Sequence, residues 1–356
     1  MSTTFYPLNV SQITKETADT VSISFDVPSD LSDTFKFIPG QYLTLKANIK
    51  GEDIRRSYSI CSADFENKLT VAVKAIENGL FSGYANNDLK EGDQLEVMPP
   101  MGGFKVETNA SNSKTYVFYA AGSGITPIIS MIKSILNDEP SSKVQLYYGN
   151  KTADDTIFKS ELDALNNGHS NFQLNYILSR QETEDALSNG RIDTAKCEEF
   201  YTKSQSGISI DGVYACGPEE MIMTVKDFYA NKGLDKSKIH FELFTVSESA
   251  KEANQSADEG TSVQSEVTVI IDDEEYEFSL HTDGKDILQA AQDEDADVPF
   301  SCKGGVCCTC RAKVMEGTVK MDLNFALEEE EVADGFILTC QAHPTSEKVV
   351  ISFDEY

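Results

Sequence analysis

Four cysteines near the end of the chain constrain its fold more than any other feature. Cys302 is followed by Cys307 and Cys310 with the spacing C-x4-C-x2-C, and 29 residues separate Cys310 from Cys340. Four thiolates with this spacing hold the two irons of a [2Fe–2S] cluster. The loop that carries the first three must also turn its backbone N–H groups toward the cluster sulfides, which tunes the reduction potential. The sequence therefore predicts an iron–sulfur domain in the last quarter of the chain.

The alternative is a zinc site made of the same four cysteines. In zinc sites the cysteines usually form two short C-x2-4-C pairs. Here three cysteines lie in one loop and the fourth is distant in sequence. Gly304 and Gly305 suit a tight cluster loop, because glycine adopts positive φ without a Cβ clash. Cys308 lies outside the ligand spacing, and we interpret it as a small packed side chain. The pattern favours [2Fe–2S] over zinc.

Length and charge narrow the class of protein further. The 356 residues are too many for one core and indicate two or three domains. No apolar run approaches the roughly 20 residues that span a bilayer. The segment MSTTFYPLNV lacks the features of a secretion signal, so we expect a cytoplasmic protein with no membrane contact. The net charge of −29 repels phosphate and argues against nucleic acid as a partner.

Residues 1–107 have the pattern of a small antiparallel β-barrel. Four segments alternate apolar and polar positions, as strands with one buried face do: 21–25, 41–47, 68–75 and 93–98. Glycine-containing turn signals lie between and after them, for example Pro39-Gly40 and Glu91-Gly92. Several short strands separated by turns predict a barrel.

The pattern changes near residue 114, where strands begin to alternate with helices. Runs typical of buried strands lie at 114–121, 143–149, 172–179 and 212–217. Helical spacing is found at 127–136, 160–168 and 219–233. This alternation predicts a parallel sheet with crossover helices over residues 108–246.

A polar stretch at 247–264 is rich in Ser, Glu and Ala and predicts a flexible linker. After it, 266–281 has the pattern of a hairpin that turns at Asp272-Asp273, and 285–295 has that of a helix. We assign residues 265–356 to the iron–sulfur domain. Residues 266–356 carry 22 acidic against 6 basic side chains, a net charge of −16. This charge either keeps the domain soluble or forms a docking face for a basic partner.

The segment Arg56-Ser57-Tyr58-Ser59 resembles the flavin-binding R-x-Y-S signature of the ferredoxin–NADP reductase superfamily. The resemblance implies that Arg56 neutralises a flavin phosphate, that Tyr58 packs on the isoalloxazine ring, and that Ser59 hydrogen-bonds near its N5 atom. Ser57 belongs to the same motif. By itself the motif is compatible with an ordinary strand, and the flavin interpretation depends on the motifs that follow it.

A second flavin segment, Gly79-Leu80-Phe81-Ser82, lies where the superfamily has its other phosphate contact. The resemblance implies binding roles for Gly79, Phe81 and Ser82, with Lys74 as a further contributor. We expect Ser82 to cap a helix at 83–89 whose N-terminus faces the pyrophosphate of FAD.

Gly122, Gly124 and Thr126 belong to the run A-G-S-G-I-T-P, which joins a predicted strand to a predicted helix. The glycines let the pyrophosphate of a nicotinamide cofactor approach the backbone. We expect Thr126 as the N-cap of the helix and Pro127 as its first residue. The run is typical of the same reductase superfamily.

The segment Cys216-Gly217-Pro218 resembles the start of the superfamily's C-G-P-x-x-M motif, whose cysteine lies beside the nicotinamide C4 atom. A buried structural thiol is the alternative for Cys216. Residues 241–244, which include Glu242, match the superfamily's terminal aromatic–acid segment near the flavin. The resemblance thus implies three catalytic residues: Ser59, Cys216 and Glu242.

Ser179 and Arg180 end a predicted strand where the adenosine ribose of the cofactor is expected. An arginine at this position accommodates the 2′-phosphate of NADPH, whereas an NADH site usually offers an acidic residue to the 2′-hydroxyl. Arg191 is a candidate for a second contact. A solvated arginine is the alternative, so the sequence favours NADPH and leaves NADH possible.

The whole chain resembles the reductase subunits of multicomponent phenylacetyl-CoA epoxygenases, for example at 148–152 and 307–311. The resemblance implies an antiparallel β-barrel FAD domain, an α/β nicotinamide domain and a β-grasp domain of the plant-type ferredoxin class. It also implies an oxidoreductase that passes electrons from NADPH through FAD and the cluster to a di-iron oxygenase component. The chain has no Glu-x-x-His pair for a di-iron site of its own.

Two other functions remain compatible with these motifs. One is the reductase of another oxygenase, hydroxylase or desaturase. The other is a zinc-stapled or flavin-bearing interaction module without turnover.

Overall fold

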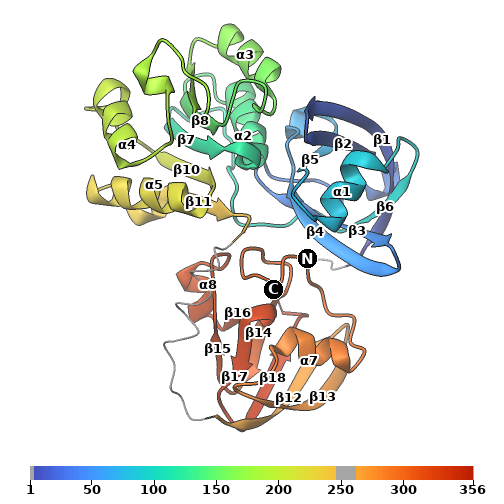
Figure 1. Ribbon diagram of the computed structural model, residues 1–356. Helices are drawn as coiled ribbons and strands as arrows, with labels where there is room; N and C mark the ends of the chain where they lie inside the picture. The colour runs from blue at the N-terminus through green and yellow to red at the C-terminus, as the bar shows by residue number, and fades with distance from the viewer. Residues whose placement is uncertain (1–3, 246–261, 356) are drawn as a thin grey trace. The chain divides into compact units, whose positions relative to one another are not determined.

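The computed structural model describes residues 4–245 and 262–355 (Figure 1). Their contacts divide the chain into two compact units. One unit holds the first two sheets, over Thr4–Ile54 and Tyr58–Phe244. The other holds the C-terminal sheet together with the short segment Arg55–Ser57. No helix among the described residues is both long and apolar enough to cross a membrane.

The first sheet is antiparallel and has six strands in the order β4-β3-β6-β1-β2-β5. The strands are β1 (Tyr6–Thr17), β2 (Thr20–Asp26), β3 (Tyr42–Ile49), β4 (Glu52–Ser59), β5 (Leu69–Lys74) and β6 (Gln94–Val97). A bridge between Ile60, just after β4, and Val71 of β5 joins the two edges, so the sheet closes as the predicted barrel. Helix α1 (Leu80–Asn87) packs against it.

All four strands predicted in this region are confirmed, but two others were not predicted. Strand β1 shifts register between Val10 and Gln12 and again between Lys15 and Thr17, which breaks the alternation that reveals a strand. Strand β4 contains a single aliphatic residue, Ile54, among charged and hydroxyl side chains. Neither strand has the apolar period on which the prediction depended.

The second sheet is parallel and has the order β11-β10-β7-β8-β9. Its strands are β7 (Thr115–Ala121), β8 (Lys143–Asn150), β9 (Phe172–Leu178), β10 (Gly212–Gly217) and β11 (Ile239–Leu243). Its helices are α2 (Ile125–Asp138), α3 (Lys159–Gly168), α4 (Thr194–Phe200) and α5 (Glu219–Asn231). The strand order reverses between β7 and β10, and in such sheets ligands bind outside the carboxyl ends of the strands at this reversal.

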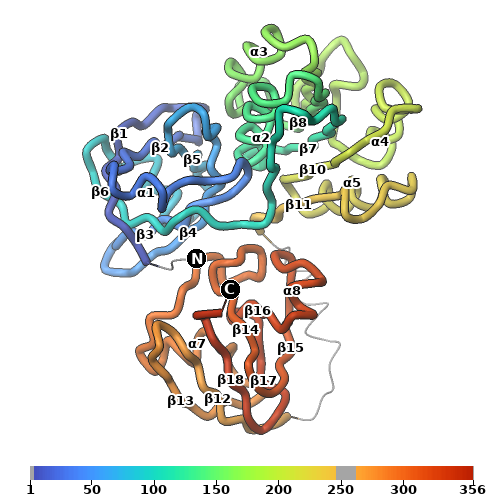
Figure 2. Tube along the Cα trace, turned by 180° about the vertical axis from the view of Figure 1, so that it is seen from behind, coloured from blue at the N-terminus to red at the C-terminus, as the bar shows by residue number. Residues whose placement is uncertain are grey.

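Helix α2 lies between the parallel sheet and the barrel in both views (Figures 1 and 2). It contacts β7, β8 and β10 of the sheet and the turn Asp64–Glu66 of the barrel. The predicted alternation of strands and helices over this region is confirmed.

The C-terminal unit is a five-stranded mixed sheet in the order β13-β12-β18-β14-β16, with a separate pair, β15 and β17. The strands are β12 (Gln264–Ile271), β13 (Glu274–His281), β14 (Arg311–Glu316), β15 (Val319–Met321), β16 (Phe336–Leu338), β17 (Ala342–Pro344) and β18 (Lys348–Ser352). The helices are α7 (Ile287–Asp293) and α8 (Glu329–Ala333). Strands β12 and β18 are parallel neighbours at the centre, which confirms the predicted β-grasp class.

The predicted hairpin and helix of this unit are also confirmed. Asp272 and Asp273 have φ of 51° and 63°, as a two-residue turn between antiparallel strands requires. The carboxylate of Asp286 accepts a hydrogen bond from the Gln289 N–H and caps α7. The predicted linker at 247–264 lies outside the described residues except for its last three positions, and Gln264 already belongs to β12.

Candidate functional site

The predicted flavin motif lies at the end of β4, beside α1. The rings of Tyr58 and Phe81 pack with their centroids 5.5 Å apart, and Phe81 meets the edge of Tyr84 at 6.3 Å. Arg56 is exposed and its guanidinium donates a hydrogen bond to the Arg55 carbonyl at 2.7 Å. Ser57 is half-buried in the same strand. The structure therefore brings the two predicted flavin segments side by side.

Ser82 is not the N-cap of a helix at 83–89, as the sequence suggested. Helix α1 begins at Leu80, and Gly79, with an extended backbone, is its N-cap. The Ser82 hydroxyl lies within the first turn, where it accepts a hydrogen bond from the Ile76 N–H at 3.3 Å. A Cβ at Gly79 would lie 2.3 Å from this hydroxyl, so the glycine allows the turn to close. The helix N-terminus is near the predicted place, but three residues earlier.

Lys74, predicted as a further phosphate contact, forms an ion pair with Asp19 at 3.3 Å. Hydrogen bonds from Thr17 and the Lys74 ammonium outweigh the effect of burial and lower the pKa of the Asp19 carboxyl. Lys74 is therefore held by an anion of the barrel itself.

The predicted nicotinamide loop connects β7 to α2, but its helix starts earlier than expected. Residues Gly122–Gly124 form a single 3-10 turn, Gly124 is the N-cap of α2, and α2 begins at Ile125. Thr126 is therefore not the N-cap, and its hydroxyl donates to the Ser123 carbonyl at 3.0 Å. Pro127 falls in the first helical turn, where its missing N–H has no intrahelical partner to lose.

The glycines of the two nicotinamide segments touch each other. A Cβ at Gly124 would lie 2.1 Å from the Cys216 carbonyl oxygen and 2.8 Å from the Gly217 nitrogen. A Cβ at Gly217 would lie 3.1 Å from the Ala121 nitrogen. Pro218 follows as the extended N-cap of α5. The ends of β7 and β10 thus form a glycine-lined backbone edge at the reversal point, which fits a pyrophosphate.

Ser59, Cys216 and Glu242, predicted as the catalytic residues, come together from three separate strands. Cys216 and Glu242 are register partners in β10 and β11. The Ser59 hydroxyl donates to Glu242 Oε2 at 3.3 Å across 183 residues of sequence. Burial raises the pKa of the Glu242 carboxyl to about 8, and the bond from Ser59 opposes this rise. Burial, and then Glu242, raise the pKa of the Cys216 thiol.

The predicted adenosine contacts lie at the carboxyl edge of β9. Ser179 and Arg180 follow this strand directly, and the Ser179 hydroxyl donates to the Asn150 carbonyl at 3.2 Å. The Gly190 N–H donates to the Leu178 carbonyl at 2.9 Å, which brings the next residue, Arg191, to the same edge. Both arginines are exposed.

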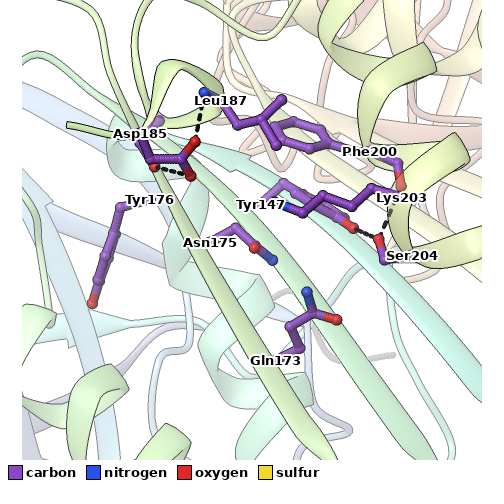
Figure 3. Close-up of a pocket in the computed structure, with 10 residues that line it drawn as sticks. Tyr147, Gln173, Asn175, Tyr176, Asp185, Leu187, Phe200, Lys203 and Ser204 are labelled. Carbon is purple, nitrogen blue, oxygen red and sulfur yellow. Dashed lines mark hydrogen bonds between the residues drawn. The ribbon is translucent and has the colours of Figure 1, made fainter. Parts of the chain in front are cut away.

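A small cavity of about 60 Å³ lies between β8, β9 and α4 (Figure 3). Tyr147, Lys203 and Asp185 contribute to its lining, and the Tyr147 hydroxyl bonds the Ser204 hydroxyl at 2.7 Å. None of the predicted site residues lines it. Ligand pockets for molecules of drug size have volumes of about 300–1,000 Å³, so this cavity does not fit a nucleotide.

The four predicted cluster ligands converge in the C-terminal unit. The Sγ atoms of Cys302 and Cys307 are 3.1 Å apart, and Cys340 interacts with both Cys302 and Cys310. The Thr339 N–H and hydroxyl both donate to the Cys310 carbonyl, at 3.1 and 3.0 Å. These two bonds hold the end of β16 against the cysteine loop.

The loop backbone follows the prediction in part. The Gly304 N–H points at the Cys302 sulfur at 3.4 Å, as a cluster loop requires. Gly305 has φ of 72°, and a Cβ there would lie 3.0 Å from the Leu323 carbonyl oxygen. Gly304 does not have positive φ; its neighbour Lys303 does, at 50°. Cys308 lies off the ligand set, with its thiol 3.4 Å from the Ala326 carbonyl.

The convergence of four thiols fits a [2Fe–2S] cluster. Among residues 4–245 and 262–355, no three His, Cys, Asp or Glu side chains have the arrangement of a single-metal site. A [2Fe–2S] cluster would instead be held by all four cysteine thiolates together. Cys340 also borders a hollow of about 420 Å³ lined by Lys303, Gln341 and His343.

The fold and these sites together define a flavin- and nicotinamide-dependent reductase with an iron–sulfur domain. Three family models match the chain: an oxidoreductase FAD-binding domain at residues 7–106, an oxidoreductase NAD-binding domain at 118–227 and a 2Fe-2S iron-sulfur cluster binding domain at 269–345. The cofactors are accordingly FAD, a nicotinamide dinucleotide and a [2Fe–2S] cluster.

Full-length relatives specify the class further. The chain is 39% identical to one of the subunits of the 1,2-phenylacetyl-CoA epoxidase of Escherichia coli K12, over 99% of this chain and 98% of that protein. It is 33% identical to the ferredoxin reductase component of 3-ketosteroid-9-alpha-monooxygenase of Rhodococcus rhodochrous, over 97% and 96% of the two chains. Phthalate dioxygenase reductase has the same fold, with a TM-score of 0.61, 24% identity and 98% coverage of both chains. The chain belongs to the family of oxygenase reductase components.

The first prediction concerns the proton on Glu242. Because burial raises the pKa of this carboxyl to about 8, it stays protonated at neutral pH and ionises as pH rises through that value. We expect the limiting rate of flavin reduction by NADPH to fall in the wild type as the pH rises through about 8, because Glu242 then becomes negatively charged. In Glu242→Gln the change should disappear, since the amide does not titrate.

Ser59→Ala provides the matched variant. It removes a hydrogen bond that favours the carboxylate, so the pH of the change should rise. Rapid-mixing measurements of flavin bleaching between pH 6 and 10 check both variants. A pH profile in Glu242→Gln identical to that of the wild type would contradict the assignment.

Proposed function

We propose that this reductase takes electrons from NADPH and delivers them to a di-iron oxygenase component that epoxidises phenylacetyl-CoA. The meeting of Ser59, Glu242 and Cys216 at the reversal point of the parallel sheet carries the reductase part of the proposal. The 39% relative, whose name places it in a 1,2-phenylacetyl-CoA epoxidase, supports the substrate. When bound, FAD accepts a hydride and releases single electrons to the cluster, which suits one-electron iron chemistry.

The side chains around the flavin position act by binding and by holding a proton. Arg56 neutralises phosphate charge, while Tyr58 and Phe81 present an aromatic surface to the flavin ring. The Ser59 hydroxyl lies at the edge that accepts the hydride. The protonated Glu242 carboxyl keeps this edge free of negative charge at neutral pH.

The residues of the parallel sheet hold the nicotinamide cofactor. Gly122 and Gly124 let the pyrophosphate reach the start of α2, and Gly217 and Pro218 shape the opposite wall. The buried, neutral thiol of Cys216 offers a small surface beside the nicotinamide ring. Arg180 and Arg191 present two cations to the 2′-phosphate of NADPH.

A second candidate function is the reductase of another oxygenase, hydroxylase or desaturase. The 33% relative is named for a 3-ketosteroid monooxygenase, so closely related chains serve different substrates. In either case the substrate is determined by the oxygenase component. The rate of electron delivery to a purified phenylacetyl-CoA epoxidase oxygenase component, compared with the rates to other purified oxygenase components, distinguishes the two functions.

The role of the cluster is tested by two neighbouring cysteines. Cys307→Ser removes a proposed ligand, so the visible cluster absorption and electron delivery to the oxygenase should be lost, while NADPH still reduces the flavin. Cys308→Ser changes a thiol of the same loop whose sulfur contacts the Ala326 carbonyl, and it should retain the cluster. Loss of the cluster in both variants, or in neither, would contradict the proposed ligand set.

The choice of NADPH is tested at the carboxyl edge of β9. Arg180→Ala should lower kcat/KM for NADPH by roughly 10-fold or more, because a hydrogen bond to a charged group contributes about 1.5–3 kcal/mol. The same variant should leave kcat/KM for NADH nearly unchanged, since NADH lacks the 2′-phosphate. Steady-state rates with both coenzymes measure this difference. Equal losses with the two coenzymes would contradict the assignment.

The charge of the C-terminal unit leads to a prediction about docking. Because residues 266–356 carry a net charge of −16, electron transfer to the oxygenase should slow as salt rises. Glu328, Glu329 and Glu330 are exposed around the start of α8, and replacing all three by Gln should weaken the salt dependence. Replacing Glu182 and Glu184, exposed in the nicotinamide domain, by Gln should not. A rate independent of salt in the wild type would refute charge-guided docking.

A further inference from the structure

A lysine lies in the middle of α2, a helix of largely apolar and buried residues. Helix α2 is buried from Ile125 to Leu136, and Lys133 is only 7% exposed. Lysine is almost never buried unless it is paired, because an isolated ammonium loses its hydration. The buried Lys133 ammonium therefore needs anionic partners close to it.

Lys133 connects the barrel to the parallel sheet through two carboxylates. Its Nζ atom lies 2.8 Å from Glu66 Oε2 in the barrel and 3.0 Å from Glu161 Oε1 on α3. The same Oε2 atom of Glu66 accepts the Ala63 N–H at 2.6 Å. Burial works to lower the pKa of the Lys133 ammonium, but Glu161 and Glu66 outweigh it and raise the pKa. Lys133 is therefore charged at neutral pH.

Two serines one turn apart strengthen the same contact. The Ser130 hydroxyl donates to the Ser62 carbonyl at 2.7 Å, and the Ser134 hydroxyl donates to Asp64 Oδ1 at 3.2 Å. Residues 130, 133 and 134 share one face of α2, since side chains three and four positions apart lie together on a helix. This face meets the barrel over the short stretch 62–66.

The two segments joined here are continuous with the two halves of the active site. Helix α2 begins at Ile125, directly after the loop proposed to hold the nicotinamide cofactor, and Gly124 of this loop is its N-cap. The stretch 62–66 follows Ser59, at the proposed flavin edge, by three residues. A shift of α2 against this stretch would change the distance between the two bound rings.

We propose that Lys133 is a positioning residue that fixes the spacing between the nicotinamide loop and the flavin strand for hydride transfer. The inference rests on the proposed function. In the step concerned, a hydride leaves the dihydronicotinamide carbon, which is oxidised, and bonds to the flavin, which gains two electrons. Such steps depend steeply on geometry: a misplacement of about 1 Å can cost on the order of 10²-fold in rate.

Lys133→Met tests this role because it keeps most of the length of the side chain and removes its charge. The limiting rate of flavin reduction by NADPH should fall roughly 10-fold or more, with little change in the NADPH concentration at half-saturation. Lys133→Arg should recover most of the rate, since it restores the cation. Lys159→Met is the matched control, because this lysine is 41% exposed and pairs with Asp163 within α3.

A second measurement is independent of activity. In protein stripped of FAD, amide hydrogen exchange over 60–67 and 124–134 should become faster in Lys133→Met and remain unchanged in Lys159→Met. If Lys133→Met fails to fold because two carboxylates are left unpaired, Ser130→Ala with Ser134→Ala removes the neighbouring contacts without leaving a buried charge. That double variant should show the same loss of rate and the same faster exchange.

The outcomes separate this inference from the proposed function. A wild-type protein whose flavin is not reduced by NADPH would refute the proposed function itself. A normal wild type together with a fully flavinated Lys133→Met that reduces at the wild-type rate would overturn the positioning role alone. The positioning role would also be overturned if Lys133→Met lost thermal stability and flavin content while its flavinated fraction kept the wild-type limiting rate.

Discussion

The close contact between two backbone turns at the reversal point of the parallel sheet is the constraint on which the reductase site depends. Any side chain at Gly124 would place a Cβ 2.1 Å from the Cys216 carbonyl, so α2 can begin here only with a glycine. Cys216 ends β10 at this contact, and its register partner Glu242 reaches Ser59 of the barrel. The nicotinamide segments and the Tyr58-Ser59 end of the flavin segment are thereby held within one compact unit.

Features that follow from local chemistry were predictable from the sequence. The cysteine spacing is set by the need to bring four thiolates to two irons, and the four sulfurs do converge. Regular strands such as β2 and β5 reveal themselves by apolar alternation, and the α/β region by its change of period. The aspartates at 272 and 273 predicted their turn because their short polar side chains tolerate positive φ.

Features that depend on tertiary contacts were not predictable from the sequence. The starts of α1 and α2 were misplaced because Ser82 and Thr126 are good caps by residue type. In the structure both lie inside their helices, and their hydroxyls bond backbone groups of residues that precede the helix. The pairing of Ser59 with Glu242 spans 183 residues, and only the resemblance to a family placed both near the flavin. From the sequence alone, Lys133 would be assigned to the solvent-exposed face of an amphipathic helix. The structure shows instead that it is paired with two carboxylates. The sequence signal for this buried lysine was a single charged residue within the otherwise uncharged run PIISMIKSIL.

The central claim is that one chain carries electrons from NADPH through a flavin to a [2Fe–2S] cluster. A visible absorption spectrum of the purified protein under nitrogen, before and after NADPH, tests it most directly. We predict overlapping flavin and iron–sulfur bands that bleach on addition of NADPH. A protein that stays colourless after reconstitution with iron, sulfide and FAD, or whose bands respond to neither NADPH nor NADH, would contradict the account.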